Sequence, residues 1–308
     1  MSRLAAVDVG TNSVLLLVAE RDHAGALHSV REEAEITRLG RGVDRTGLLS
    51  PEGMEATLEV LARYASLARA DRAEALVVTA TSAARDARNG AEFLARARER
   101  AGVAVEILSG DEEARLSYLA VAEEFGDESG AAGLLVVDVG GGSTELVCGR
   151  GRAVDFRRSL DIGSVRLTER CVATDPPSAA EQDTIRRAVR EALSALPAFP
   201  SEVRVVGVAG TVTSLFALRH AIEPYDASRV HGGWLSVEDV AAVREHLCSV
   251  PLAARRALPG MQPKRADVLP AGALLFETVL LHLRAAGARV SDRGLRWGVL
   301  IDRWEALG

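Results

Sequence analysis

The feature that most constrains this chain is a polar turn that occurs twice inside hydrophobic sequence. Residues 7–18 read VDVGTNSVLLLV and residues 137–148 read VDVGGGSTELVC, at a constant offset of 130 residues. In each copy an aspartate ends a predicted strand, and a glycine opens a tight turn before a second strand. Two such turns in matching register indicate that a whole structural unit is duplicated.

The elements predicted around the two turns follow a similar order. In the first half we expect strands at 4–9, 13–20, 26–33, 75–81 and 103–108, and helices at 51–70, 90–100 and 111–125. In the second half we expect strands at 134–139, 144–148, 153–160, 203–208 and near 290, and helices at 178–195, 236–249, 266–286 and 295–307. Three strands followed by alternating helices and strands, present twice, predict an α/β fold made by duplication.

The stretch 126–133, which is small and polar, is the predicted linker. It gives a first domain of residues 1–128 and a second of residues 129–308. The final helix, about residues 295–308, is allowed to pack back on the first domain.

We interpret the repeated turn as a phosphate clamp. Because glycine tolerates positive φ, we expect the glycines to let successive backbone N–H groups converge on one anion. The hydroxyl groups that follow are added donors. The predicted phosphate-binding residues of the two turns are Gly10, Thr11, Asn12, Ser13, Gly140, Gly141, Gly142 and Ser143. For either turn alone, an ordinary hairpin is an equal alternative.

Composition narrows the functions open to such a clamp. The net charge of −6 does not attract a polyanion over the whole surface, and 4% aromatic residues argue against a base-stacking platform, so nucleic acid is not an expected partner. Lys264 is the only lysine, so a Gly-Lys-Ser/Thr phosphate loop is excluded. Apolar runs are too short for a membrane helix, and three cysteines without metal-ligand spacing suit a cytoplasmic protein.

Eight segments together carry a resemblance to a known family. They are AAVDVGTNS, TATSAARDA, VEILSGDEEARLSYLAV, VVDVGGGSTELV, GVAGTVTSL, VHGGWLSVEDV, RADVLPAGALLFETVL and GLRWGVL. They resemble the exopolyphosphatase and guanosine-pentaphosphate phosphohydrolase (Ppx/GppA) family, in its short two-domain form. The resemblance implies two actin-like (ribonuclease H-like) domains with the active site in the interdomain cleft. Trp297 departs from the pattern, because the family often has glutamate there.

The segment LSGDEEARLSY, residues 108–118, contains the candidate general base. If Ser109 is the N-cap of the following helix, Glu112 is at N3 and forms a capping box. Glu113 then lies on another side of the helix, free of the cap. The resemblance places the family's catalytic glutamate on Glu113 as well. The alternative is that both glutamates only stabilise the helix N-terminus.

Arg85 in TATSAARDA follows a strand end, where open α/β sheets present ligands. It resembles the family's phosphate-binding arginine, and a solvated surface arginine is the alternative. In GVAGTVTSL, Gly210 and Thr211 would place helix N-terminal amides near a distal phosphate or a nucleotide. His231 and Asp267 match family motifs, but a structural histidine and a helix N-cap are their alternative interpretations.

Carboxylates beside the turns are the expected metal ligands. Asp138, with Glu145 and Asp8, is predicted to hold Mg²⁺ or another divalent cation. Three further arginines are candidates to line a channel for a longer polyanion, with a solvated face as the equal alternative. They are Arg38, Arg41 and Arg45.

The expected function is a Mg²⁺-dependent exopolyphosphatase, a hydrolase acting on phosphoric anhydrides, in which water attacks the terminal phosphoryl group of inorganic polyphosphate and Glu113 accepts the proton. Guanosine pentaphosphate is a second candidate substrate. The alternatives are an ATP-dependent small-molecule kinase of the actin-like and sugar-kinase superfamily, and a non-catalytic regulatory binder of phosphorylated nucleotides. The sequence does not choose between the two substrates, and it leaves chain-length preference and a homodimer open.

Overall fold

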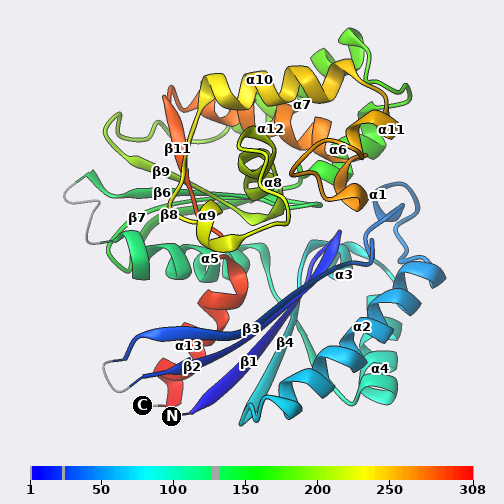
Figure 1. Cartoon of the computed structure of the whole chain (residues 1–308), viewed down its shortest axis with the longest axis vertical. Helices are drawn as coiled ribbons and strands as arrows, with labels where there is room; N and C mark the ends of the chain where they lie inside the picture. The colour runs from blue at the N-terminus through cyan, green and yellow to red at the C-terminus, as the bar shows by residue number, and fades with distance from the viewer. Residues whose placement is uncertain (1, 23–24, 127–131, 308) are drawn as a thin grey trace. The chain divides into compact units, whose positions relative to one another are not determined.

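The computed structural model describes residues 2–22, 25–126 and 132–307. The chain divides into two compact units, which we call unit 1 (residues 1–120 and 295–308) and unit 2 (residues 121–294). Each unit contains one sheet with its own helices (Figure 1). The domain boundary predicted at 128/129, with most of the predicted linker, lies outside the described residues, so that boundary stays a prediction.

Unit 1 is built on a five-stranded mixed sheet in the order β3-β2-β1-β4-β5. Its strands are β1 (Arg3–Val9), β2 (Ser13–Arg21), β3 (Leu27–Ile36), β4 (Ala75–Ala80) and β5 (Val105–Ile107). β1 pairs antiparallel with β2 and parallel with β4, so the polar turn of residues 10–12 lies at the carboxyl end of the central strand. That edge is where open α/β sheets bind ligands.

Helices cover both faces of this sheet. They are α1 (Val43–Thr46), α2 (Pro51–Ala70), α3 (Ser82–Asp86), α4 (Gly90–Ala101), α5 (Gly110–Phe125, which continues into unit 2) and α13 (Leu295–Leu307). Alternate residues of β1 point into two separate cores, one containing Val7 with α2 and α4, and the other containing Ala6 with α5 and α13. α2 begins as the sequence predicts, because the Ser50 hydroxyl accepts from the N–H of Gly53 and Pro51 is the first helical residue.

Unit 2 repeats this topology with one strand added. Its sheet has the order β10-β11-β9-β6-β7-β8. Taken from the opposite edge, strands β8-β7-β6-β9-β11 correspond to β3-β2-β1-β4-β5, and β10 is the added strand. The strands are β6 (Leu134–Val139), β7 (Thr144–Arg150), β8 (Ala153–Leu160), β9 (Arg204–Val208), β10 (Trp234–Ser236) and β11 (Gly287–Val290). The matching strand order confirms the predicted duplication.

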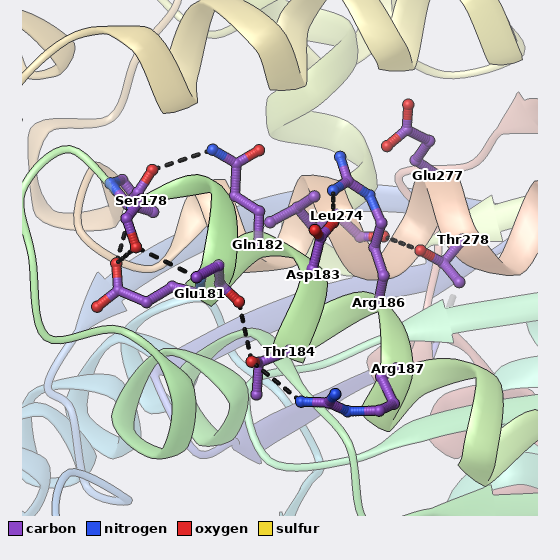
Figure 2. Close-up of polar contacts among 12 residues, drawn as sticks. Ser178, Glu181, Gln182, Asp183, Thr184, Arg186, Arg187, Leu274, Glu277 and Thr278 are labelled. Atoms are coloured by element: carbon purple, nitrogen blue, oxygen red, sulfur yellow. Dashed lines mark hydrogen bonds and ion pairs between the residues drawn. The ribbon is translucent and has the colours of Figure 1, made fainter.

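Helices α6, α7, α8 and α10 of unit 2 pack against a buried helix, α12, and the unit has further short helices. The helical elements of unit 2 are α6 (Ser164–Cys171), α7 (Ala179–Leu193), α8 (Ala209–Arg219), α9 (Ala227–Val230), α10 (Val237–Ser249), α11 (Leu252–Arg255), a 3₁₀ turn (Pro263–Arg265) and α12 (Leu269–His282). Figure 2 shows how α7 begins beside α12. The Ser178 hydroxyl accepts from the Glu181 N–H, and the Glu181 carboxylate accepts from the Ser178 N–H at 2.7 Å, which completes a capping box.

Within the described residues, no helix is long and apolar enough to cross a membrane. The predicted elements are present with ends that shift by a few residues, as for the helix predicted at 266–286 and found at Leu269–His282. The elements that the sequence did not predict are short. They include α1, α3, α6, α9, β10 and α11.

Candidate active site

Each of the two repeated turns contains the same backbone hydrogen bond, from its first glycine to the residue three positions later. The Gly10 N–H donates to the Ser13 carbonyl at 2.9 Å, and the Gly140 N–H donates to the Ser143 carbonyl at 3.1 Å. The predicted reason for the glycines is wrong, because neither Gly10 nor Gly140 has a positive φ. Glycine is instead favoured by space, since an added Cβ would lie 3.2 Å from the Ser13 oxygen in one copy and 3.0 Å from the Ser143 oxygen in the other.

In unit 2 the carbonyl groups of the turn are bound by the start of α6. The Gly140 carbonyl accepts from the Ser164 N–H at 3.0 Å, and the Gly141 carbonyl accepts from the Val165 N–H at 2.9 Å. The Gly142 carbonyl accepts from the Arg166 side chain, also within α6. Because carbonyl and N–H point in opposite directions across a trans peptide, the N–H groups of residues 141–143 point away from α6. These N–H groups are thus on the side of the turn that α6 leaves uncovered.

In unit 1 the segment after β3 binds the turn in the same way. The Thr11 carbonyl accepts from the Gly40 N–H at 2.8 Å, and the Asn12 carbonyl accepts from the N–H groups of Thr37 and Arg38. The N–H groups of residues 12 and 13 therefore point away from that segment. The Asn12 side chain is buried, and among the described residues its Nδ2 has no hydrogen-bond acceptor. A buried donor of this kind calls for an acceptor such as a phosphate oxygen.

The candidate general base, Glu113, is buried at the start of α5 and is held by Arg85. One Arg85 nitrogen, Nη1, donates to Glu113 Oε2 at 3.1 Å and to the Leu108 carbonyl at 2.8 Å. Arg85 lies on α3, after the end of β4, and Glu113 lies on the helix that follows β5, so adjacent parallel strands bring the two residues together. Arg85 is therefore part of a structured pair, and its alternative interpretation as a solvated arginine is wrong.

The capping prediction for α5 is confirmed in its first half. The Ser109 hydroxyl accepts from the Glu112 N–H at 3.2 Å, as an N-cap does. The Glu112 carboxylate is bound by Arg115 at 3.0 and 2.7 Å, whereas a complete capping box would turn it back to the Ser109 N–H. Glu112 and Glu113 therefore have different partners, which separates their roles as the spacing predicted.

Two carboxylates in unit 2 form one polar row across the sheet. Asp138 on β6 is the register partner of Glu145 on β7, and Glu145 is the register partner of Ser159 on β8. Directly opposed residues in a sheet project from the same face. The Ser159 hydroxyl donates to Glu145 Oε1 at 2.7 Å, and Asp138 and Glu145 are both buried.

The corresponding row in unit 1 is mostly apolar. Asp8 on β1 is the register partner of Leu15, and Leu15 is the register partner of Ala34. Among the described residues, no group of three or more His, Cys, Asp or Glu side chains could hold a metal ion. Mg²⁺ commonly takes one or two carboxylates, with substrate phosphates and water completing its shell. The buried carboxylates of Asp138 and Glu145 fit that requirement in unit 2. Asp8 fits it less well, because its row across the unit 1 sheet contains no second carboxylate.

The turn from β9 into α8 is strained at the first residue of the helix. Ala209 has a φ of 67°, in the left-handed region that non-glycine residues rarely adopt. At the next residue, Gly210, an added Cβ would lie 2.1 Å from Nη1 of Arg265, so only glycine lets this guanidinium approach the start of α8. Thr211 is buried in the first turn of the helix. No local sequence pattern links Arg265 to this turn, because it is more than 50 residues from Gly210 along the chain.

His231 and Trp297 have structural roles, whereas Asp267 does not cap α12. His231 Nδ1 accepts from the Asp292 N–H at 3.2 Å, and its Nε2 lies 2.8 Å from a carboxylate oxygen of Glu124, which supports the interpretation as a structural histidine. Asp267 is not the N-cap of α12, because that position is Val268. Trp297 is buried in the core between α13 and the unit 1 sheet, so this position is part of the packing.

A duplicated mixed sheet of this order, with a glycine turn between the first two strands of each copy, defines an actin-like ATPase fold. Comparison with known proteins narrows the class. A sequence model of the Ppx/GppA phosphatase family matches residues 17–306. The chain belongs to the Ppx/GppA phosphatase family, and it is a phosphohydrolase by that membership.

Relatives agree with this assignment over nearly the whole chain. Exopolyphosphatase 2 of Mycobacterium tuberculosis (strain CDC 1551 / Oshkosh) is 42% identical over 295 residues, which cover 92% of each chain. The crystal structure of the Aquifex aeolicus member of the Ppx/GppA family is 34% identical, covers 100% of this chain and 99% of that one, and gives a TM-score of 0.83. The structure of an exopolyphosphatase-like protein is 33% identical, covers 99% and 100%, and gives a TM-score of 0.92.

Proposed function

We propose that this protein is an exopolyphosphatase that removes the terminal phosphate of inorganic polyphosphate by attack of water. The observation that carries the proposal is the Arg85–Glu113 pair, in which a buried carboxylate is held beside a guanidinium at 3.1 Å. The similarity to exopolyphosphatase 2 over most of both chains supports the choice of substrate. Guanosine pentaphosphate, which also ends in a phosphoric anhydride, is the second substrate to test.

In the proposed step, water attacks the terminal phosphorus in line with the bridging oxygen. A new P–O bond forms, the bridging P–O bond breaks, and the products are phosphate and a polymer shorter by one unit. Glu113 accepts the proton of the attacking water, and Arg85 stabilises charge on the terminal oxygens through its remaining N–H groups. Phosphoryl transfer of this kind depends mainly on positioning and electrostatic stabilisation.

The two turns bind phosphate oxygens in this proposal. In unit 1 the donors are the N–H groups of residues 12 and 13 and the buried Nδ2 of Asn12. In unit 2 they are the N–H groups of residues 141–143, and Gly210 and Thr211 are a further candidate pair. Asp138 and Glu145 would hold a divalent cation, Mg²⁺ by preference, with Asp8 as a weaker candidate; such a cation neutralises negative charge on phosphate oxygens.

The first test is phosphate release from polyphosphate, ATP and guanosine pentaphosphate, measured side by side with and without Mg²⁺. The proposal expects release from polyphosphate that requires the cation. A phosphorylated acceptor formed from ATP and candidate sugars or acids would instead establish the kinase. Tight binding of guanosine pentaphosphate without release of phosphate from any substrate would establish the regulatory binder.

The second test addresses the residue roles. Glu113→Gln keeps the size of the side chain and its ability to accept a bond from Arg85, but removes the base. We expect turnover to fall by about 10²–10⁴ while polyphosphate binding is largely kept. Glu112→Gln is the matched control, because Glu112 is the adjacent carboxylate and its partner is Arg115. Full turnover in Glu113→Gln would remove this residue from the mechanism.

A further inference from the structure

The polar row of unit 2 ends in a hydroxyl group, that of Ser159 on the edge strand β8. Its Oγ donates to Glu145 Oε1 at 2.7 Å, and Glu145 is the register partner of Asp138. Both carboxylates are buried. Because buried charges in proteins are generally paired or bind metals, a row with two carboxylates on one face of a sheet fits a cation.

A β-bulge sets the register that brings Ser159 opposite Glu145. The pairing of β7 with β8 shifts by one residue after Cys148, which leaves Asp155 of β8 without a register partner. Side chains alternate between the two faces of a strand, so one residue more or less exchanges the faces. Without the bulge, Arg158 would stand opposite Glu145, and the Ser159 hydroxyl would be on the other face.

Unit 1 has the same bulge at the equivalent place. The pairing of β2 with β3 shifts after Val18, which corresponds to Cys148 at the offset of 130 residues that relates the two polar turns. In the resulting register Ala34 of β3 takes the place that Ser159 has on β8. The bulge is therefore common to both copies, whereas the hydroxyl is present only in the copy that has two carboxylates in the row.

A hydrogen bond to one oxygen has a specific effect on a glutamate side chain. The terminal torsion of glutamate has broad preferences, so the plane of its carboxylate is easily turned. A bond from Ser159 to Oε1 fixes that plane, and with it the direction in which Oε2 presents its lone pairs. Carboxylates that bind metal ions are commonly held by such outer partners, which raise the metal affinity. Ser159 is thus placed to act on a cation through Glu145.

We propose that Ser159 is a positioning residue, whose hydroxyl group holds the Glu145 carboxylate in the orientation in which it binds a divalent cation together with Asp138. This inference rests on the proposed function, in which these two carboxylates hold Mg²⁺. It deepens that proposal by assigning part of the cation affinity to a residue on the neighbouring strand. The competing interpretation is that the hydroxyl only satisfies a buried carboxylate and stabilises the sheet.

The test measures the binding of Mn²⁺ alone to the wild type and to variants, from the loss of the electron paramagnetic resonance signal of free Mn²⁺. Mn²⁺ takes the same kinds of oxygen ligand as Mg²⁺, and the measurement needs no substrate and no turnover. We expect the dissociation constant of Ser159→Ala to rise by about 10- to 100-fold. An unchanged dissociation constant would overturn the inference.

Two further variants at this position separate the hydroxyl group from the shape of the side chain. Ser159→Thr keeps the hydroxyl on a β-branched side chain that suits a strand, and it should keep most of the wild-type affinity for Mn²⁺. Ser159→Val has nearly the shape of threonine without the hydroxyl, and it should bind as weakly as Ser159→Ala. Equal binding by the threonine and valine variants would overturn the inference, even if Ser159→Ala did not fold.

Ser29→Ala is the matched control. Ser29 is exposed on β3, the edge strand of the unit 1 sheet, so the change removes the same group from the equivalent strand of the other copy. Its Mn²⁺ affinity should equal that of the wild type. Urea unfolding without a cation completes the comparison. A Ser159→Ala protein that is less stable but binds Mn²⁺ as tightly as the wild type would establish the competing, purely structural role.

Phosphate release from polyphosphate gives a second readout. The Mg²⁺ concentration for half-maximal release should rise in Ser159→Ala by about the same factor as the Mn²⁺ dissociation constant. Most of the lost turnover should return at saturating Mg²⁺, because in this proposal Ser159 does not touch the reacting atoms. A loss of turnover that saturating Mg²⁺ does not restore would contradict a role in cation affinity.

A failure of the proposed function gives a different result from a failure of this inference. If the wild type binds Mn²⁺ but releases no phosphate from polyphosphate, the exopolyphosphatase proposal is wrong, and the Mn²⁺ comparison still decides the role of Ser159. If the wild type binds no Mn²⁺, the proposed cation site is wrong, and the role of Ser159 is wrong with it.

Discussion

Removing the charges of Arg85 and Glu113, singly and together, is the most direct test of the ion pair described in unit 1. The two side chains meet at 3.1 Å, with 24% and 11% of their side-chain surfaces exposed. Arg85→Gln removes the cation and leaves the buried carboxylate without this partner. Glu113→Gln removes the anion but keeps an oxygen that accepts a hydrogen bond. The double variant removes both charges.

The magnitude follows from the distance and the burial. Two unit charges at 3.1 Å interact by about 5 kcal/mol at an effective dielectric constant of about 20. Water reaches part of the Arg85 side chain, and desolvation of both groups offsets part of the attraction, which leaves a coupling of about 1–3 kcal/mol. Arg85→Gln should be the more destabilising single change, because it strands a buried charge.

The assay is a double-mutant cycle from urea unfolding curves. The coupling energy is the amount by which the loss in the double variant differs from the sum of the two single losses. Arg98→Gln, an exposed arginine without this burial, should stay within about 0.5 kcal/mol of the wild type. Additive losses, with a coupling below about 0.5 kcal/mol, would refute the reasoning that the pair is a buried ionic contact.

Three further predictions follow from other contacts. Gly298→Ala should destabilise unit 1 by about 1–3 kcal/mol in urea unfolding, because the added Cβ would lie 1.9 Å from the Leu116 carbonyl oxygen; an unchanged midpoint would contradict this packing. Ala209→Gly should stabilise the protein by up to about 1 kcal/mol, because it relieves a φ of 67°, and a clear loss of stability would argue against strain. Hydrogen bonds from Thr174, Ala173 and Ser178 lower the pKa of Glu181 from 4.5 to about 2, so its contribution is present above pH 4.5 and is lost as pH falls toward 2. The melting temperature of Glu181→Gln should therefore lie below that of the wild type at neutral pH, and this difference should narrow between pH 4.5 and 2. A difference that stays constant with pH would show that the carboxylate charge is not what stabilises the segment of residues 173–178.

The sequence predicts most of the fold, because the duplication is written in matching local patterns. Strand β6 and helix α2 occur at their predicted bounds, 134–139 and 51–70, since each is delimited by a clear polar or proline signal. Short elements such as α6 were missed. Their position depends on contacts with a distant turn, here the bonds from Ser164 and Val165 to Gly140 and Gly141, which periodicity does not show.

Some residues of the candidate site were likewise marked by the sequence, and others needed the structure to be found. Arg85 and Glu113, which the sequence marked separately as catalytic candidates, meet because each follows one of two adjacent parallel strands. Ser159, which donates to Glu145, needed the register of β7 and β8 to be found. Arg265 needed the three-dimensional approach of its guanidinium to the start of α8. The explanation of Gly10 and Gly140 by positive φ failed because a sequence does not distinguish a glycine kept for its backbone angles from one kept for lack of space.

The difference between the row Asp138–Glu145–Ser159 and its counterpart Asp8–Leu15–Ala34 bears on how the two halves tolerate change. The acid on β7 and the hydroxyl on β8 that line up with Asp138 occur only in the C-terminal copy, because Leu15 and Ala34 occupy the equivalent positions on β2 and β3. Harmful substitutions at these equivalent positions should therefore concentrate in the C-terminal copy, and Leu15 and Ala34 should accept other apolar residues freely.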